Sequence, residues 1–258
     1  MSVRAATMLG CQHDRAEMNP LEFFQAGKLG EAIAALGDTL RRNPTDDKSR
    51  TFLFELLCFS GEYDRAEKHL DVLAQNGVQP EMGAMLYRGA IYATKIREDL
   101  FRDGKISRSA ALTESSEGIE GTLNGTPFHT LVDADSRVGA NLEVFAAGNY
   151  LLIPYSVLAS VEITPPRRLR DLLWIPAVIR TKPDYKDREL GETLLPALTP
   201  FSSKNENDAV RLGRETAWEE CEAGEVFPVG QKILLADDEE MPILDLRKLE
   251  FTVAQGAS

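Results

Sequence analysis

The chain contains 258 residues, of which 43% are hydrophobic and 27% are charged, and its formal net charge is -12. This balance is typical of a folded globular protein and excludes wholesale disorder. The negative charge argues against nucleic acid as a partner, because affinity for phosphate backbones comes largely from clustered Lys and Arg. No run of residues approaches the ~20 apolar positions of a membrane span, so we expect no membrane partner and a cytoplasmic location.

The three cysteines, Cys11, Cys58 and Cys221, are widely spaced and form no CxxC pair. This spacing fits neither a disulfide framework nor a zinc site, and it favours a reducing compartment. The sequence also lacks the glycine-rich phosphate loops and the GxSxG motif of common enzyme classes. We therefore expect no cofactor and no bound metal.

Residues 1–18 show no strong periodicity and are interpreted as a tail, whereas the segment that follows contains an internal repeat. An offset of ~34 residues is the spacing of tetratricopeptide repeats, in which each unit is a helical hairpin. A glycine permits a left-handed turn between the two helices, and an alanine lets them approach closely. The repeated positions are Gly27, Leu29, Ala32 and Leu36, which recur as Gly61, Tyr63, Ala66 and Leu70.

A TPR-like helical domain is therefore expected over residues 19–106. The helix predicted at 49–60 carries large apolar side chains all around, so it should be buried on most sides. A third helical segment, residues 82–103, lacks the repeat signature and is interpreted as a helix that caps the stack. Residues 107–118 are polar and rich in small side chains, and we expect them to be a linker.

Residues 119–258 are expected to form an α+β domain with a curled, mostly antiparallel sheet, which makes the whole chain a multidomain α and β protein. Asp133 is predicted to cap a helix in which Val138, Leu142 and Phe145 share a face and which Gly148 ends. Short apolar runs between turn residues predict strands, and the charge run at 237–240 is interpreted as a hairpin turn. The predicted strands cover residues 150–155, 158–163, 177–181, 192–198, 216–222, 225–235 and 241–246, with a short helix at 206–214.

Residues 149–177 combine two apolar runs, a proline pair and a charged group that leads directly into Trp174. Charged side chains this close to an apolar run need partners, because an unpaired buried guanidinium costs several kcal/mol. We predict that Arg170 and Asp171 pair with each other. The segment is interpreted as a structural latch between two strands.

His129, Asp133 and Asp135 are the one cluster that could serve acid–base or metal chemistry. One interpretation is a metal-dependent hydrolase centred on these three residues. The alternative is a helix N-terminus, where carboxylates accept hydrogen bonds from free N–H groups and Arg137 pairs with one of them. One histidine with two aspartates gives no recognisable zinc spacing and no nucleophile with a base, so we favour the structural alternative and predict no catalytic residue.

One block of the sequence, residues 121–177, matches a known family pattern. The matching residues are Gly121, Gly125, Phe128, Asp133, Asp135, Arg137, Gly139, Leu142, Glu143, Gly148, Tyr150, Ile153, Pro154, Leu169, Arg170, Asp171, Leu172, Trp174, Pro176 and Ala177. With this pattern the chain resembles the ImpE family, also called SciE or TagJ, which comprises accessory proteins of bacterial type VI secretion clusters. The structural motif that the resemblance implies consists of Asp133, Asp135, Arg137, Tyr150, Arg170, Asp171 and Trp174.

The resemblance implies an adaptor and not an enzyme. Family members are associated with the contractile sheath: they bind the N-terminal helix of the small sheath subunit and so link the sheath to the AAA+ ATPase that disassembles it. The family contributes no catalytic, cofactor-binding or metal-binding residue, and the partner-binding residues stay unassigned. We expect an amphipathic helix to dock in an apolar groove of one domain, and a generic peptide-binding TPR scaffold is the remaining alternative.

Overall fold

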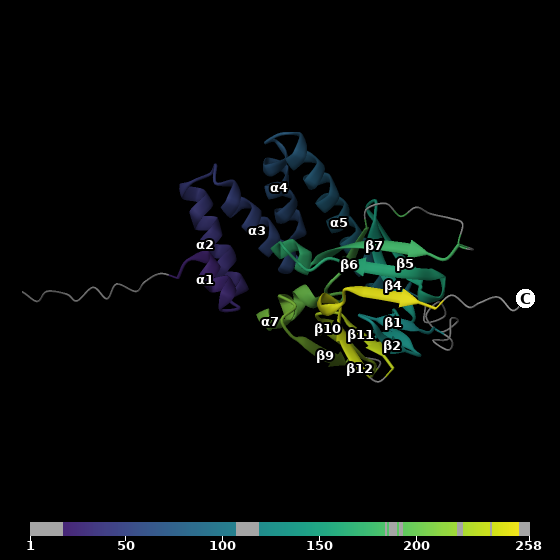
Figure 1. Ribbon diagram of the computed structural model, residues 1–258. Coiled ribbons are helices and arrows are strands. Elements are labelled where there is room, and N and C mark those ends of the chain that lie inside the picture. Colours follow the sequence, from purple (N-terminus) through teal and green to yellow (C-terminus); the bar gives the residue numbers. More distant parts are fainter. Residues whose placement is uncertain are drawn as a thin grey trace, which may run out of the picture.

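The computed structural model describes residues 18–106, 119–183, 185, 190, 193–220, 224–237 and 239–252. The expected linker at 107–118 and nearly all of the expected tail lie outside these residues. In the described part, a stack of helices lies beside a sheet-rich half, and the two are in broad contact (Figure 1). The predicted combination of TPR-like helices and an antiparallel sheet is therefore confirmed. None of the described helices has the length and apolar character needed to cross a membrane.

The helical half consists of consecutive helices that pack on one another in chain order. Gly27 and Gly61, which end the first helix of each repeat, both have a φ of +74°, the left-handed conformation that the repeat predicts. The last helix begins four residues earlier than expected and has 25 residues, so it extends past the stack onto the sheet. The helices are α1 (Pro20–Gln25), α2 (Leu29–Arg42), α3 (Asp47–Phe59), α4 (Tyr63–Ala74) and α5 (Val78–Arg102).

The main sheet has eight strands in the order β2-β1-β13-β6-β7-β8-β4-β5, and all neighbouring strands in it pair antiparallel. It is open, with β2 and β5 at its edges, and not closed into a barrel. Its strands are β1 (Gly121–Leu123), β2 (Thr126–Phe128), β4 (Asn141–Ala146), β5 (Asn149–Pro154), β6 (Leu158–Ile163), β7 (Trp174–Thr181), β8 (Thr193–Pro196) and β13 (Lys248–Phe251).

Two smaller sheets and a few short turns complete the described sheet-rich half. Strands β3 (Leu131–Asp133), β11 (Ile233–Ala236) and β12 (Glu239–Pro242) form one sheet, and β9 (Thr216–Glu220) pairs with β10 (Val226–Gly230) in the other. The turn between β11 and β12 confirms the hairpin predicted at the charge run. The short helix predicted at 206–214 is α7 (Asp208–Arg211), and single 3-10 turns occur at η2 (Leu169–Leu172) and η3 (Ser202–Lys204).

The helix predicted after Asp133 is wrong, because this stretch forms β4, β5 and the hairpin between them. All six residues of β4 are buried. A strand covered on both faces is apolar without alternation, so residues three or four apart can mimic a helical face. Gly148 does not end a helix; together with Ala147 it forms the two-residue turn of the hairpin, and both have positive φ angles of +76° and +48°.

The strand predicted over residues 225–235 is also wrong in its extent. The first strand, β10, ends at Gly230, and the strand that follows, β11, belongs to a different sheet. Gly230 has a φ of +112°, and a Cβ at this position would lie 2.2 Å from the Glu215 carbonyl oxygen. The backbone approach therefore requires glycine, and it ends the strand.

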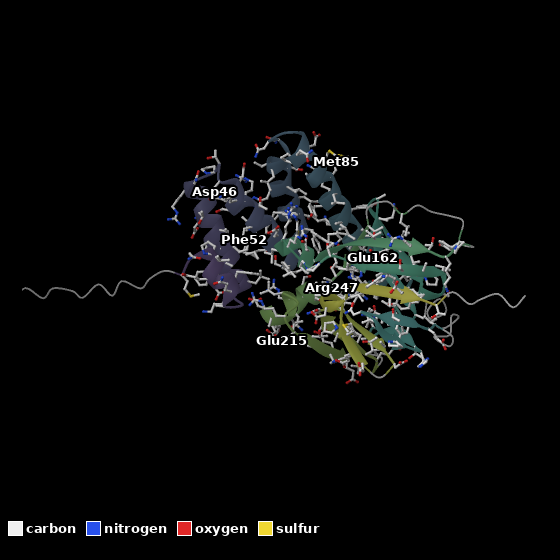
Figure 2. All side chains as sticks on the ribbon, viewed as in Figure 1. Asp46, Phe52, Met85, Glu162, Glu215 and Arg247 are labelled. Atoms are coloured by element: carbon white, nitrogen blue, oxygen red, sulfur yellow. The ribbon has the colours of Figure 1, made fainter. Side chains whose placement is uncertain are left out.

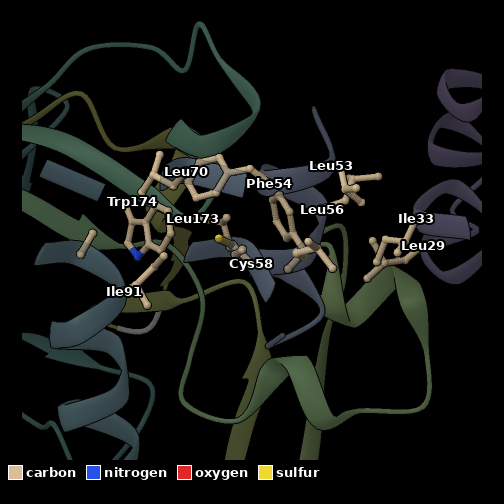
Figure 3. Packing of buried hydrophobic residues seen from close by; sticks show 14 of the residues in the cluster. Leu29, Ile33, Leu53, Phe54, Leu56, Cys58, Leu70, Ile91, Leu173 and Trp174 are labelled. Carbon is tan, nitrogen blue, oxygen red and sulfur yellow. The ribbon is translucent and has the colours of Figure 1, made fainter. Parts of the chain in front are cut away.

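Two apolar cores form, and one of them is shared by the two halves. The first core contains the inner faces of the helices together with Phe145, Leu173, Trp174, Leu194 and Leu212 from the sheet-rich half. Figure 3 shows Leu173 and Trp174 packed among side chains of the helices. The second core lies within the sheet-rich half and is formed by the main sheet together with the sheet of β3, β11 and β12. Because the first core draws on both halves, separating them would expose large apolar surface.

The stretch around α7 and η3 runs along the turns of the helical repeats. The Arg214 guanidinium donates hydrogen bonds to the Phe24 carbonyl oxygen at 2.7 Å and to the Gln25 carbonyl oxygen at 3.2 Å. The Asp208 carboxylate accepts a 2.7 Å hydrogen bond from the backbone N–H of Leu29, where α2 begins. At the second repeat, a Cβ on Gly61 would lie 2.6 Å from the Ser203 hydroxyl oxygen. Each repeat turn therefore rests against the sheet-rich half.

Candidate functional site

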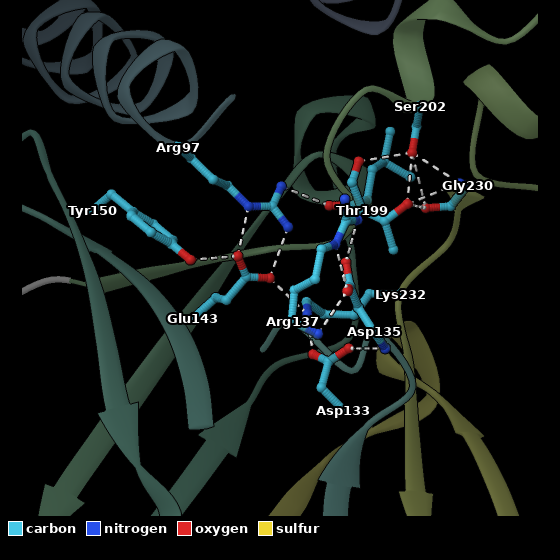
Figure 4. A network of polar contacts seen from close by, with 11 residues as sticks. Arg97, Asp133, Asp135, Arg137, Glu143, Tyr150, Thr199, Ser202, Gly230 and Lys232 are labelled. Carbon is cyan, nitrogen blue, oxygen red and sulfur yellow. Dashed lines mark hydrogen bonds and ion pairs between the residues drawn. The ribbon is translucent and has the colours of Figure 1, made fainter. Parts of the chain in front are cut away.

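The most concentrated polar chemistry in the described residues is an ionic network buried between α5 and the sheet (Figure 4). Arg97 of α5 donates two hydrogen bonds to the Glu143 carboxylate of β4, at 2.6 and 2.7 Å. Its third donor reaches the Leu198 carbonyl oxygen at 2.9 Å. Tyr150 of β5 donates to the same Glu143 carboxylate at 2.8 Å. The side chains of Arg97 and Glu143 are 3% and 0% exposed, so water screens this pair very little.

Lys232, which lies just before β11, extends the network to a second carboxylate. Its ammonium group lies 2.6 Å from a Glu143 oxygen and also donates a hydrogen bond to Asp133 at the end of β3. The other Asp133 oxygen accepts a 2.9 Å hydrogen bond from the backbone N–H of Asp135. The Arg137 guanidinium donates two hydrogen bonds, of 2.8 and 2.6 Å, to the Asp135 carboxylate. The network contains three cations and three carboxylates, so its formal charges balance.

The network shifts the pKa values of its carboxyl groups in opposite directions. Burial would raise the pKa of Glu143, but the charges and hydrogen bonds of Arg97 and Lys232 outweigh it and lower the pKa to about 2. Asp133 has only Lys232 as a cationic partner, and burial together with the Glu143 carboxylate raises its pKa to about 6. Glu143 is therefore always ionised near neutral pH, and Asp133 is the group whose charge is least stabilised.

Aromatic rings cover the network on the side of Arg137. The guanidinium of Arg137 lies 4.8 Å from the ring centre of Phe101 in α5 and 4.2 Å from that of Phe227 in β10. A guanidinium stacked on aromatic faces gains cation–π attraction, and here the stack joins α5 to a strand of the sheet-rich half. The buried network therefore joins the helices to the sheet, and its hydrogen-bond donors and acceptors bind one another.

A second contact between the two halves involves the motif at residues 170–174. The indole of Trp174 packs against Tyr87 of α5, with ring centres 5.9 Å apart, and donates a 3.2 Å hydrogen bond to the Thr94 hydroxyl. The Arg170 guanidinium lies 4.8 Å from the Tyr87 ring centre and 3.3 Å from a Glu55 oxygen of α3. This segment is a latch, but it joins the sheet-rich half to the helices and does not join two strands.

The predicted pairing of Arg170 with Asp171 is wrong. The Asp171 carboxylate instead accepts hydrogen bonds from the backbone N–H groups of Arg167 and Arg168, at 2.9 and 3.0 Å, and so caps η2. Neighbouring residues in this turn point in different directions, which leaves Arg170 free to reach Glu55. Glu55 is nearly buried, and burial raises its pKa despite the Arg170 charge.

His129 and the two aspartates of the predicted cluster do not meet. The imidazole of His129 is exposed, and its Nδ1 lies 3.7 Å from a carboxylate oxygen of Glu120. The carboxylates of Asp133 and Asp135 are buried and already paired with Lys232 and Arg137. Within the described part of the chain, no group of three or more His, Cys, Asp or Glu residues could hold a metal ion. The helix N-terminus offered as the alternative is also wrong, since both aspartates belong to strand ends and turns.

Three charged partners in these contacts escaped the sequence reasoning: Arg97, Lys232 and Glu55. Lys232 lay inside a stretch predicted as one apolar strand, and a lysine there requires a nearby counter-charge. Arg97 lies on the helix face of Ala90, Ala93 and Phe101, which are all buried. In each case, a charged residue among apolar neighbours could have indicated a buried ion pair. The sequence did not indicate which residue is the partner, because that residue lies far away in the chain.

Two open apolar grooves flank the latch. The sheet groove, about 720 Å³, is lined by Leu86 and Tyr87 of α5 and by side chains of β6, β7 and β8, including Val178. The helix groove, about 590 Å³, lies among α3, α4 and α5 and is lined by Phe54, Leu70 and again Leu86 and Tyr87. Both grooves are of a size that accommodates apolar side chains of a partner.

Comparisons with known proteins agree with this architecture. A family model described as ImpE protein matches residues 125–250, and a tetratricopeptide repeat model matches residues 23–87. The chain is 31% identical to the type VI secretion system accessory component TagJ of Pseudomonas aeruginosa, over 89% of this chain and 90% of that protein. A crystal structure of a Vibrio parahaemolyticus protein has the same fold, with a TM-score of 0.78, 24% identity, and coverage of 92% of this chain and 98% of that one. The chain belongs to the ImpE family.

Proposed function

We propose that this chain is a non-enzymatic adaptor of a bacterial type VI secretion system. The observation that carries the proposal is the 31% identity to a type VI secretion accessory component over nearly the full length of both proteins. The finer role is binding of the N-terminal helix of the small sheath subunit, which links the sheath to the AAA+ ATPase that disassembles it. TPR-like helices and open apolar grooves support this role, because amphipathic helices are commonly recognised in such grooves.

The proposed role of the family motif is structural. Asp133, Asp135, Arg137 and Tyr150 belong to the buried network, and Arg170 and Trp174 belong to the latch. Their polar atoms bind one another and face the contact between helices and sheet. A hydrolytic site would need such groups to converge on space that a substrate can enter. This arrangement supports an adaptor whose two halves move as one unit.

Isothermal titration calorimetry tests the proposal. The full chain is titrated with a synthetic peptide that spans the N-terminal helix of the small sheath subunit encoded in the same secretion cluster. We expect 1:1 binding with a negative heat capacity change, because apolar surface is buried. A scrambled peptide of the same composition is the control and separates specific recognition from a generic peptide-binding scaffold. No heat with the native peptide, together with no competition by the intact sheath subunit, contradicts the proposal.

The full chain is the appropriate reagent for these measurements. Trp174 and Leu194 of the sheet-rich half contribute to the core of the helices, so isolated halves would expose that core. The link to the ATPase is tested by a pull-down of the ATPase on immobilised sheath subunit, with and without this chain. We expect more ATPase to be retained when the chain is present. Equal retention in both cases would remove the linking role and leave peptide binding intact.

A further inference from the structure

The sheet groove and the helix groove adjoin each other. Leu86 and Tyr87 of α5 line both grooves, so the two meet along the first half of this helix. Apolar side chains around them are open to solvent: Val178 of β7 is 53% exposed, and Met82 and Met85 of α5 are 62% and 65% exposed. Figure 2 shows Met85 on α5, with Glu162 and Arg247 on the sheet side. We call this combined surface the joined groove.

The backbone under the joined groove favours a helix as the occupant. Strands β6, β7 and β8 are interior strands, each of which pairs with a neighbour on both sides. An extended peptide therefore finds no free N–H or C=O groups with which to add a strand. A helix satisfies its own backbone hydrogen bonds and needs only side-chain contacts.

The helices leave part of the sheet face in the joined groove uncovered. Trp174 and Val178 are four residues apart on β7, so they lie on the same face of the sheet. Trp174 is 3% exposed because α5 and its neighbours cover it, whereas Val178 is 53% exposed. The helical layer therefore covers this face only in part, and a further helix beside α5 would extend it over Val178.

Charges around the joined groove select the kind of helix. Arg168 lines its helical part and Arg247 lines its sheet part, and among the described residues neither forms a close ion pair; Arg247 donates to the Leu244 and Leu246 carbonyl oxygens, and Arg168 acts on Glu55 only through its charge. Of the two acids that line it, Glu162 pairs with Arg180 at 2.6 Å, and Asp47 keeps its charge because its 2.7 Å hydrogen bond comes from the neutral amide of Asn76. The four lining cations, Arg168, Arg170, Arg247 and Lys248, outnumber these two acids, so the lining is net positive, although the chain as a whole carries a net charge of -12.

We propose that the joined groove binds one amphipathic helix whose apolar face lies over Leu86 and Val178 and whose acidic residues approach Arg168 and Arg247. This inference rests on the proposed function and assigns the binding surface for the sheath-subunit helix. Attraction between the basic rim and an acidic helix speeds encounter and fixes its orientation, and apolar burial supplies the affinity.

Peptide titrations of matched variants of the full chain test this assignment. Val178→Glu places a carboxylate under the helix, and we expect Kd to rise about tenfold or more, because an unpaired charge is buried on binding. Val226→Glu is its matched control, since Val226 is also a strand valine and is 52% exposed, but it lies on β10 outside the joined groove. Arg168→Glu is expected to raise Kd about threefold to tenfold.

The charge reversal has its own control and its own complementary measurement. Lys28→Glu reverses an exposed cation that lies at the start of α2, away from the joined groove, and should leave Kd unchanged. A peptide in which the acidic residues are replaced by Lys should bind Arg168→Glu more tightly than it binds the wild type. All variants change exposed side chains, and thermal unfolding confirms that each one is folded.

The outcomes separate this inference from the proposed function. If the wild type does not bind the native peptide, the proposed function fails. If the wild type binds and both Val178→Glu and Arg168→Glu bind equally well, the adaptor role stands and the joined groove is overturned as the site. If Val178→Glu weakens binding but charge reversal on either molecule has no effect, the requirement for an acidic helix is overturned.

Discussion

Replacement of Arg97 by methionine should destabilise the chain far more than the loss of an ordinary surface charge. The side chain is 3% exposed and makes hydrogen bonds of 2.6 and 2.7 Å to Glu143 and one of 2.9 Å to the Leu198 carbonyl oxygen. Arg97→Met leaves the Glu143 carboxylate buried with Lys232 as its one remaining cation. Removal of one partner of a buried ion pair costs about 3–5 kcal/mol, and we expect a loss in that range.

Urea unfolding at neutral pH measures this loss. Of the two tryptophans, Trp174 lies at the contact between helices and sheet, so a Trp218→Phe background makes its fluorescence the reporter. Arg102→Met is the matched control, because this arginine of the same helix makes an exposed ion pair with Asp99 and should contribute less than about 1 kcal/mol.

A double-mutant cycle isolates the pair. Arg97→Met combined with Glu143→Leu removes one charge of each sign, so the remaining network stays neutral. We expect the double variant to lose about 2 kcal/mol less unfolding free energy than the sum of the losses of the two single variants. If the losses are additive, or if Arg97→Met alone costs less than about 1 kcal/mol, the network does not hold the two halves together.

Three further predictions concern buried groups. The raised pKa of Asp133, about 6, means that its charged form is disfavoured in the folded state, so the wild type should lose about 2 kcal/mol relative to Asp133→Asn as pH rises from about 4 to about 7; urea unfolding across this range measures it, and parallel pH profiles would contradict it. Trp174→Phe should cost about 1 kcal/mol through the lost hydrogen bond to Thr94, and Trp174→Ala about 3–5 kcal/mol; an unchanged stability of Trp174→Phe in urea denaturation would show that the indole N–H contributes nothing. Burial raises the pKa of the Cys58 thiol well above its usual range, so in a Cys11→Ser, Cys221→Ser background it should react with a thiol reagent only after unfolding, and fast labelling of that native variant would refute the burial of Cys58.

The helical half could be predicted from the sequence because its constraints are local. The turn glycine and the small residue of each repeat act within one hairpin, and the 34-residue offset places both hairpins. The strands flanked by prolines and turn residues were also located within a few residues, for example β5 and β6. These elements are determined by residues close together in the chain, so their sequence patterns predict them.

The sites could not be predicted because they depend on distant partners. Arg170 was assigned to the adjacent Asp171, but its partner Glu55 lies 115 residues away. Likewise β4 is buried on both faces because α5 covers one of them, so its sequence lacks alternation, and it is a strand through its pairing with β5 and β8. Local propensity gives no information on which element covers which face, and these two errors have that common origin.

The close fit between the repeat turns and the stretch around α7 and η3 affects how the molecule comes apart. Arrays of helical repeats usually unravel from a free end, since each unit contacts only its neighbours. Here Arg214 and Asp208 form hydrogen bonds with the first hairpin, and Ser203 packs against the turn of the second hairpin at Gly61. We therefore expect the helical hairpins to unfold together with the sheet-rich half and not one after another from a free end.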